Sequence, residues 1–232
     1  MTLPILTLFL PDVAVATRQD FLTFIGQYVH TFALQRQDDF IKAQCDAEYF
    51  HKDKQRTEKK PKLIHSLMLE NQLALRAYTP LGIETLKFWF ELFSKAHPEF
   101  CKNSLLKNET CSIEQSQKKH LYSSTNWIPY RKCSYKHGFY YNEAVHEVAN
   151  FHNTLLGNLR TFLNLLGFDN TLRFNLSLKT LKKHRPVVAL LDQKKDIVKN
   201  AFSVVVETDL TLPSIFSLGQ NVGYGNGVFF KK

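Results

Sequence analysis

The residues best suited to acid–base chemistry gather in one polar segment of the chain. His51 lies between Tyr49 and Lys54, within a charged and polar stretch that runs from 35 to 62. An imidazole can accept or donate a proton near neutral pH, because its ordinary pKa is about 6.5. A lysine or a phenol can stabilise a developing anion or transfer a second proton. Because long polar loops in compact domains are often functional, His51, Lys54 and Tyr49 are our first catalytic candidates.

A second histidine, His30, is also a catalytic candidate. It lies nine residues after Phe21, in a segment whose apolar residues recur at helical spacing. Nine residues of α-helix turn the chain by about 180° beyond whole turns, so His30 leaves the core face of this helix. From that position it faces either a groove or solvent. For each of the nine histidines, a purely structural role is the alternative.

Sequence motifs for metal-dependent catalysis are absent. A zinc-protease helix would need histidine where Asn150 follows His146-Glu147, and no Asp-x-Asp or Cys-x-x-Cys pair occurs. We therefore expect no metal and no cofactor. If the chain cuts RNA, a base would take the proton of the 2′-hydroxyl, which attacks the adjacent phosphorus. An acid would then protonate the leaving 5′-oxygen, and the product end would be a 2′,3′-cyclic phosphate.

The charge balance indicates an anionic partner. The 232 residues carry a formal net charge of +9, which suggests nucleic acid or an anionic membrane surface. Phosphate contacts would position RNA without reading its sequence. A solvated basic surface is the alternative. The basic residues that we expect to bind RNA are Arg173, Lys179, Lys182, Lys183 and Arg185. Lys118 and Lys119 form a further basic cluster.

A glycine-rich stretch near the end of the chain is the second candidate for phosphate binding. Successive backbone N–H groups in such a loop can form an anion-binding concavity. The spacing excludes a dinucleotide site, because only five residues follow the last glycine and no helix can form. The alternative is a tight hairpin before a final strand. The glycines of this stretch are Gly219, Gly223, Gly225 and Gly227.

Hydrophobic periodicity predicts an α+β fold with two repeated halves. Strands are expected at 3–10, 62–68, 72–78, 122–130, 172–179, 186–191 and 201–207, and helices at 17–32, 82–96 and 142–166. Residues 99–120 are poor in apolar side chains and predict a weak edge strand and a linker. The strand at 172–179 should have one wet, basic face. This order is typical of two tandem ferredoxin-like halves, 1–118 and 119–232.

Three motifs resemble the RAMP superfamily of CRISPR-associated proteins, and within it the endoribonucleases that cut CRISPR repeat transcripts. They occur in the family's order and span most of the chain. The resemblance implies the same tandem fold with a C-terminal glycine-rich loop, and family members often carry histidine near His51. Many have a second histidine two residues later, where this chain has Asp53. The motifs are Leu212-Pro213 with the glycine-rich stretch and final strand, Lys62–His65 running on to Pro80–Leu86, and Thr125–Tyr130.

The function that we expect is metal-independent cleavage of hairpin-containing CRISPR repeat RNA to give guide RNAs. The alternatives are a non-catalytic RNA-binding subunit of a CRISPR effector complex and an unrelated basic interaction protein. Other effector subunits are further candidate partners. No stretch reaches the eighteen or so apolar residues that a membrane span requires, and the N-terminus lacks the basic start of a signal peptide. A cytoplasmic protein is the simplest expectation.

Overall fold

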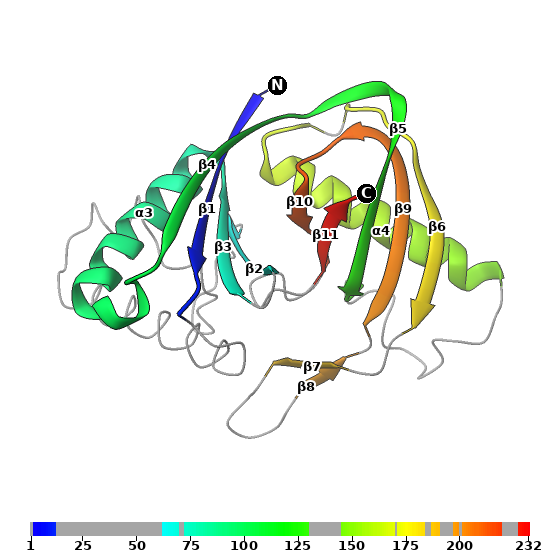
Figure 1. The fold of residues 1–232 in the computed structure, drawn as a ribbon. Helices are drawn as coiled ribbons and strands as arrows, with labels where there is room; N and C mark the ends of the chain where they lie inside the picture. The colour runs from blue at the N-terminus through cyan, green and yellow to red at the C-terminus, as the bar shows by residue number, and fades with distance from the viewer. Residues whose placement is uncertain are drawn as a thin grey trace, which may run out of the picture. The chain divides into compact units, whose positions relative to one another are not determined.

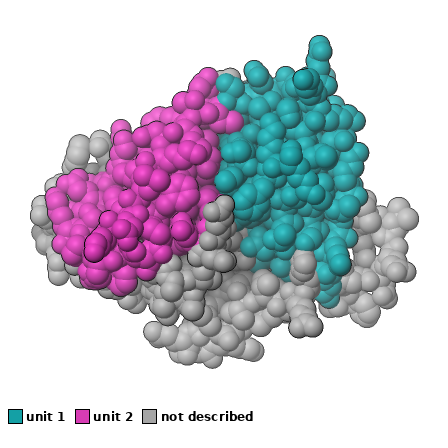
Figure 2. Space-filling model, viewed as in Figure 1, with its two compact units in different colours: residues 1, 112–232 teal, residues 2–111 magenta. Residues whose placement is uncertain are grey.

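The computed structural model contains two compact units, which we describe separately (Figure 1). The N-terminal unit is Thr2–Cys111 and the C-terminal unit begins at Ser112 (Figure 2). No helix within the described ranges has the length and hydrophobicity needed to cross a membrane. The structure describes residues 2–12, 62–69, 72–129, 145–169, 171–183, 187–190, 197–199, 201–219 and 227–232.

The N-terminal unit is built on a four-stranded sheet with the order β2-β3-β1-β4. This is the strand order of a ferredoxin-like half, in which the first and third strands lie at the centre. The helix α3 connects β3 to β4 and packs against β1 and β3. The elements are β1 (Thr2–Leu10), β2 (Ile64–Leu69), β3 (Gln72–Tyr78), α3 (Thr79–Ala96), the short 3-10 helix η3 (Pro98–Phe100) and β4 (Leu105–Ser112).

The helix α3 begins three residues earlier than its apolar pattern predicts. Pro80 occupies its first turn, where the missing N–H costs no helical hydrogen bond. The Thr79 side-chain oxygen accepts a hydrogen bond from the backbone N–H of Gly82 at 3.3 Å. A Cβ atom on Gly82 would lie 3.0 Å from the Cβ atom of Leu63, so glycine allows the close approach of helix and strand. The carbonyl oxygen of Leu63 in turn accepts a hydrogen bond from the backbone N–H of Tyr78 at 3.1 Å.

The C-terminal unit repeats this strand order and adds one strand at an edge. Its five-stranded sheet has the order β10-β11-β5-β9-β6, so β11-β5-β9-β6 matches the ferredoxin-like order of the first half. A separate hairpin of β7 and β8 lies in the chain between β6 and β9. The elements are β5 (Glu114–Trp127), α4 (Val145–Leu165), β6 (Leu176–Lys183), β7 (Val187–Leu190), β8 (Ile197–Lys199), β9 (Phe202–Thr211), β10 (Ile215–Ser217) and β11 (Val228–Lys231).

Aromatic side chains form the core between α4 and this sheet. Phe151 of α4 contacts Phe202 of β9, with ring centroids 4.9 Å apart. Phe162 of α4 stacks on Phe216 of β10 at 5.6 Å, and Phe216 stacks on Phe229 of β11 at 5.5 Å. The helix predicted at 142–166 buries Phe151, Leu155, Leu159 and Phe162, which recur at helical spacing.

The end of α4 also follows its sequence signals. Gly167 has φ of +88°, the left-handed conformation of a glycine after a helix C-terminus. Its N–H reaches the carbonyl oxygen of Asn164, and the Phe168 N–H reaches that of Leu163, both at 3.0 Å. These bonds satisfy carbonyl groups that the last turn leaves without helical partners.

The two-half α+β fold is confirmed, and the region between the halves differs from its prediction. Residues 99–120 were expected to contain a weak edge strand and a linker. The edge strand exists as β4, but only Ile113 separates β4 from β5. Low apolar content misled the prediction, because most side chains of β4 and of the first half of β5 are exposed. The division into domains 1–118 and 119–232 stays a prediction.

Candidate nucleic-acid interface

The C-terminal sheet has one face packed on α4 and an opposite face, which we call the outer face. Tyr122 belongs to the α4 side, because its ring meets that of Phe216 at 5.3 Å. Side chains alternate between faces along a strand, so Leu121 and Ser123 belong to the outer face. Phe230 follows the fully buried Phe229 and pairs with Ser123. Phe230 is therefore an outer-face residue.

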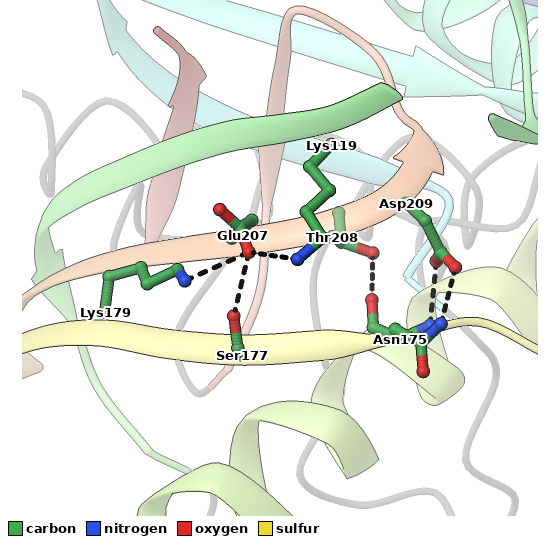
Figure 3. Close-up of polar contacts among 7 residues, drawn as sticks. All are labelled: Lys119, Asn175, Ser177, Lys179, Glu207, Thr208 and Asp209. Carbon is green, nitrogen blue, oxygen red and sulfur yellow. Dashed lines mark hydrogen bonds and ion pairs between the residues drawn. The ribbon is translucent and has the colours of Figure 1, made fainter. Parts of the chain in front are cut away.

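Three charged side chains from three adjacent strands meet on the outer face (Figure 3). Glu207 of β9 lies between Lys119 of β5 and Lys179 of β6. Its Oε1 atom is 3.0 Å from the Lys179 Nζ atom and 3.2 Å from the Lys119 Nζ atom. The hydrogen bond from Lys179, aided by Lys119, lowers the pKa of Glu207 although partial burial opposes the shift. We call these three residues the lysine–glutamate cluster.

Strand pairing explains how this cluster forms. Glu207 pairs with Leu121 on one side and with Ser177 on the other. A bulge in β6 between Leu178 and Thr180 adds one residue to that strand, so Lys179 is the extra residue.

Lys182 and Lys183, which we predicted from the sequence to act together, lie on opposite faces of β6. Lys182 pairs with Ser203, whereas Lys183 pairs with Phe202, a buried residue of the α4 side. Paired residues of antiparallel strands share a face. Lys182 therefore shares the outer face with the lysine–glutamate cluster, and Lys183 projects from the opposite face of the strand.

A second polar group fixes the start of β6 against β9 (Figure 3). The Asp209 carboxylate accepts two hydrogen bonds from Asn175, one from its backbone N–H and one from its side-chain amide, both at 2.8 Å. It accepts a third from the side-chain amide of Gln115 at 3.0 Å. The Thr208 hydroxyl donates to the Asn175 carbonyl oxygen at 2.7 Å. Burial alone would raise the pKa of Asp209, but the hydrogen bonds from Asn175 and Gln115 outweigh it and lower the pKa. This group holds the start of β6 beside β9, the two strands that carry Lys179 and Glu207.

The two described glycines of the glycine-rich stretch are required by contacts within the protein. Gly219 has φ of +98°, and a Cβ atom there would lie 2.3 Å from the Ile128 carbonyl oxygen. Gly227 has φ of +68°, and its Cβ atom would lie 1.9 Å from the Leu218 carbonyl oxygen. The Gly227 N–H donates to the Asn126 carbonyl oxygen at 3.0 Å. The two ends of the stretch thus form the tight base of a hairpin.

The sequence-predicted site residues fall into two groups. Arg173, Lys179, Lys182 and Lys183 are all exposed, and the three lysines belong to β6. Their role in RNA binding stays a prediction, as does that of Gly219 and Gly227. The sites that lie outside the described residues are His51, His30, Lys54, Tyr49, Arg185, Gly223 and Gly225.

Three other histidines in strands or helices have described side chains. His65 is buried, donates from Nε2 to the Lys62 carbonyl oxygen at 3.1 Å, and has its pKa lowered to about 4, chiefly by burial. His120 lies 3.3 Å from the Thr211 hydroxyl, and burial followed by the nearby Lys231 and Lys118 charges lowers its pKa. The Nε2 atom of His152 donates to the Leu176 carbonyl oxygen at 2.8 Å. These contacts give each histidine a structural partner.

Sequence reasoning missed two outer-face residues. Glu207 was assigned only to the end of a strand, and Phe230 only to the final apolar run. A signal for Phe230 was available, because alternation places one residue of the Phe229-Phe230 pair on each face. No group of three or more His, Cys, Asp or Glu side chains in the described part of the chain is arranged to hold a metal ion.

Comparison with known proteins identifies the fold. No protein-family model matches the chain, and no curated protein matches it. Solved structures do match over the full length of both chains. A crystal structure of the CRISPR RNA processing endoribonuclease Cas6b has a TM-score of 0.67 at 16% identity, and a second Cas6b structure has 0.64 at 16%.

A more distant match extends the same group. The type IV Cas6 crRNA endonuclease Csf5 has a TM-score of 0.56 at 12% identity, again with 100% of both chains covered. The resemblance found in the motifs is thereby confirmed at the level of the fold. This chain has the tandem ferredoxin-like fold of the Cas6 CRISPR RNA processing endoribonucleases.

Proposed function

We propose that this protein is an endoribonuclease that binds CRISPR repeat RNA and cleaves it to generate guide RNAs. The observation that carries the proposal is the match of the whole chain, with both ferredoxin-like halves, to the CRISPR RNA processing endoribonuclease Cas6b. The basic composition and the exposed lysines of β6 support an RNA ligand. Repeat RNA with a hairpin would offer a stem for basic residues and single-stranded flanks for other contacts.

The chemistry that we propose needs only protein side chains and the substrate's own nucleophile. His51 acts as the general base or acid, and Lys54 and Tyr49 stabilise the pentacoordinate phosphorane or transfer the second proton. His30 contributes if the active site includes the first predicted helix. The 2′-oxygen attacks the adjacent phosphorus, the bond to the 5′-oxygen breaks, and that oxygen takes a proton. The products carry a 2′,3′-cyclic phosphate and a 5′-hydroxyl.

Repeat RNA tests this function directly. We expect cleavage to persist in EDTA, and we expect a substrate with 2′-deoxyribose at the scissile nucleotide to bind but stay intact. His51→Ala should slow cleavage by roughly 10²–10⁴, the usual contribution of one general acid or base, with RNA affinity little changed. His97→Ala, at a half-buried histidine whose Nδ1 atom lies 3.3 Å from a carboxylate oxygen of Glu99, is the matched control and should cleave like the parent. Full activity of His51→Ala would exclude that assignment, and a requirement for Mg²⁺ would exclude the mechanism.

A non-catalytic RNA-binding subunit is the second candidate. Asp53 favours it, because many members of the family that the chain resembles carry a second histidine at this place. Salt-dependent binding of repeat RNA without cleavage by the parent protein would select this function, and co-purification with other effector subunits would support it. If the protein fails to bind repeat RNA even at low salt, both functions are excluded and a basic protein with a different partner remains.

A further inference from the structure

Two exposed apolar side chains lie together on the outer face. Leu121 is 39% exposed and Phe230 is 38% exposed. Phe230 pairs with Ser123, two residues from Leu121 on the same face, so the two side chains are diagonal neighbours. They are the large apolar residues that the C-terminal unit exposes within its described part. The outer face thus has a small apolar platform with an aromatic ring.

Positive charge borders this platform directly. Leu121 pairs with Glu207, whose carboxylate binds Lys119 and Lys179. Two ammonium groups share one carboxylate oxygen, which leaves an excess of positive charge and holds the two groups close together. The side chain of Lys119 is 68% exposed and that of Lys179 is 45% exposed. Each ammonium has three N–H donors, so each keeps donors for a further anion.

The chemistry of this surface fits a nucleotide. An aromatic ring can stack on any nucleobase, and lysines beside it can bind the phosphate of the same or the next nucleotide. Two apolar side chains are too small a surface for a stable protein interface, which buries 20 to 30 residues a side as a rough guide. A base in a duplex is already paired and stacked, so only single-stranded RNA can offer its face to Phe230.

We propose that the outer face of the C-terminal sheet is a binding subsite for single-stranded RNA. Phe230 stacks on a base, with Leu121 beside it, and Lys119 and Lys179 bind the adjoining phosphate. Glu207 is a positioning residue that holds both ammonium groups at that place. The choice of RNA rests on the proposed function, but the subsite binds RNA without requiring that this chain cleave it.

The test uses a single-stranded oligoadenylate RNA that carries one 2-aminopurine, with the full-length protein. Stacking on Phe230 should quench the fluorescent base. Phe230→Ala should weaken binding roughly 10-fold and remove much of the quenching, because stacking on an aromatic side chain contributes that order of affinity per base. Phe230→Trp should restore both. Phe230→Leu retains apolar packing and tests the aromatic ring if the alanine variant fails to fold.

The phosphate half of the subsite is tested by salt dependence. Lys119→Gln with Lys179→Gln should flatten the slope of log K against log salt by about 0.7 for each lost contact with single-stranded RNA. Lys95→Gln is the matched control, because Lys95 is also an exposed lysine paired to a glutamate, 2.7 Å from Glu91 on α3 of the other unit. Its slope should equal that of the parent.

The outcomes separate this proposal from the endoribonuclease proposal. If repeat RNA is cleaved but the Phe230 and lysine variants bind oligoadenylate like the parent, the subsite is excluded and the enzyme stands. If no repeat RNA is cleaved but these variants lose quenching and salt dependence, the subsite stands and the enzyme does not. Equal weakening of a blunt RNA duplex by Phe230→Ala would also exclude base stacking.

Discussion

In each of the two sheets, one charged side chain links three adjacent strands, but this link is buried in the N-terminal sheet and exposed in the C-terminal sheet. In the N-terminal sheet, Arg76 on β3 donates to the Thr7 hydroxyl on β1 at 3.2 Å and pairs with Glu109 on β4 at 2.8 Å. In the C-terminal sheet, Glu207 on β9 binds Lys119 on β5 and Lys179 on β6. In each case one charged residue links three adjacent strands.

Burial decides what each link can do. The Arg76 side chain is 4% exposed, and its sheet face also holds the buried His65, which pairs with it across β2 and β3. A buried charge is costly unless it is paired, so removing one partner of this network would destabilise the N-terminal unit. Exposed charges contribute little stability, but they remain accessible to a ligand. The same fold thus places a structural network on one sheet and a candidate RNA contact on the other.

Removing the buried arginine should produce the largest effect. Arg76→Met removes the donor to the Thr7 hydroxyl and leaves Glu109 with only the exposed Lys107 as its cationic partner. We expect a loss of about 3 kcal/mol in the free energy of unfolding, the lower end of the range for broken buried pairs. Denaturant titration measures it, with Lys179→Met as the exposed counterpart. Similar losses in both variants would abolish the distinction between the two sheets.

The C-terminal sheet should instead be most sensitive to its backbone. Gly227→Ala places a Cβ atom against the Leu218 carbonyl oxygen at positive φ, and we expect a loss of at least about 2 kcal/mol. Gly157→Ala is the control, because that α4 glycine has open space around it and alanine favours helix. The control should gain about 0.5–1 kcal/mol. A neutral Gly227→Ala, measured by thermal unfolding, would contradict the structure of the hairpin base.

Acid should weaken the N-terminal sheet through His65. Its pKa is about 4 in the folded protein, chiefly because of burial, against an ordinary value of 6.5. Between these values the unfolded chain binds a proton that the folded chain does not. Stability is therefore complete above pH 6.5 and falls toward pH 4 by about 1.4 kcal/mol per pH unit.

Unfolding free energies measured at several pH values test this dependence. His65→Gln should remove most of the slope between pH 6.5 and 5, above the range in which carboxylates titrate. His120→Gln, in the C-terminal sheet, should alter it less because that imidazole is only half-buried. An unchanged slope in His65→Gln would show that the imidazole does not control this transition.

The smallest effect on stability should come from the exposed cluster. Glu207→Gln removes the shared carboxylate of two exposed lysines, and we expect little change in Tm. The pKa of Glu207 is lowered by Lys179 and Lys119, so Lys119 and Lys179 should lose their common position only as this carboxylate is protonated in acid. A large drop in Tm at pH 7, measured by circular dichroism, would place Glu207 with Arg76 as a structural residue.

Local patterns predicted most elements, because they depend on neighbours in the sequence. The strand at 72–78 and the long helix ending at Leu165 follow directly from apolar periodicity. The predicted strand at 172–179 instead begins at Leu176, since Asn175 is fixed by Asp209 ahead of the sheet. Periodicity could not show that a residue 34 positions away sets this start.

The polar clusters could not be predicted for the same reason. Arg76 and Thr7 are 69 positions apart in the sequence, and their meeting depends on the register of β1 against β3. Lys119 was one of several basic residues with no sign that Glu207 would hold it beside Lys179. Strand order and register determine which charges are buried and which are accessible to a ligand, and local sequence patterns do not specify either.

The bulge in β6 gives the strand one residue more than its partner β9 needs. Leu176, Leu178 and Leu181 all pair with residues of the α4 side, although five positions separate the first from the last. A deletion of the Lys179 codon would therefore leave a regular strand with these leucines still inward. Related genes that differ in length by one residue at this point can encode the same sheet, and they would differ chiefly in the charge presented beside Glu207.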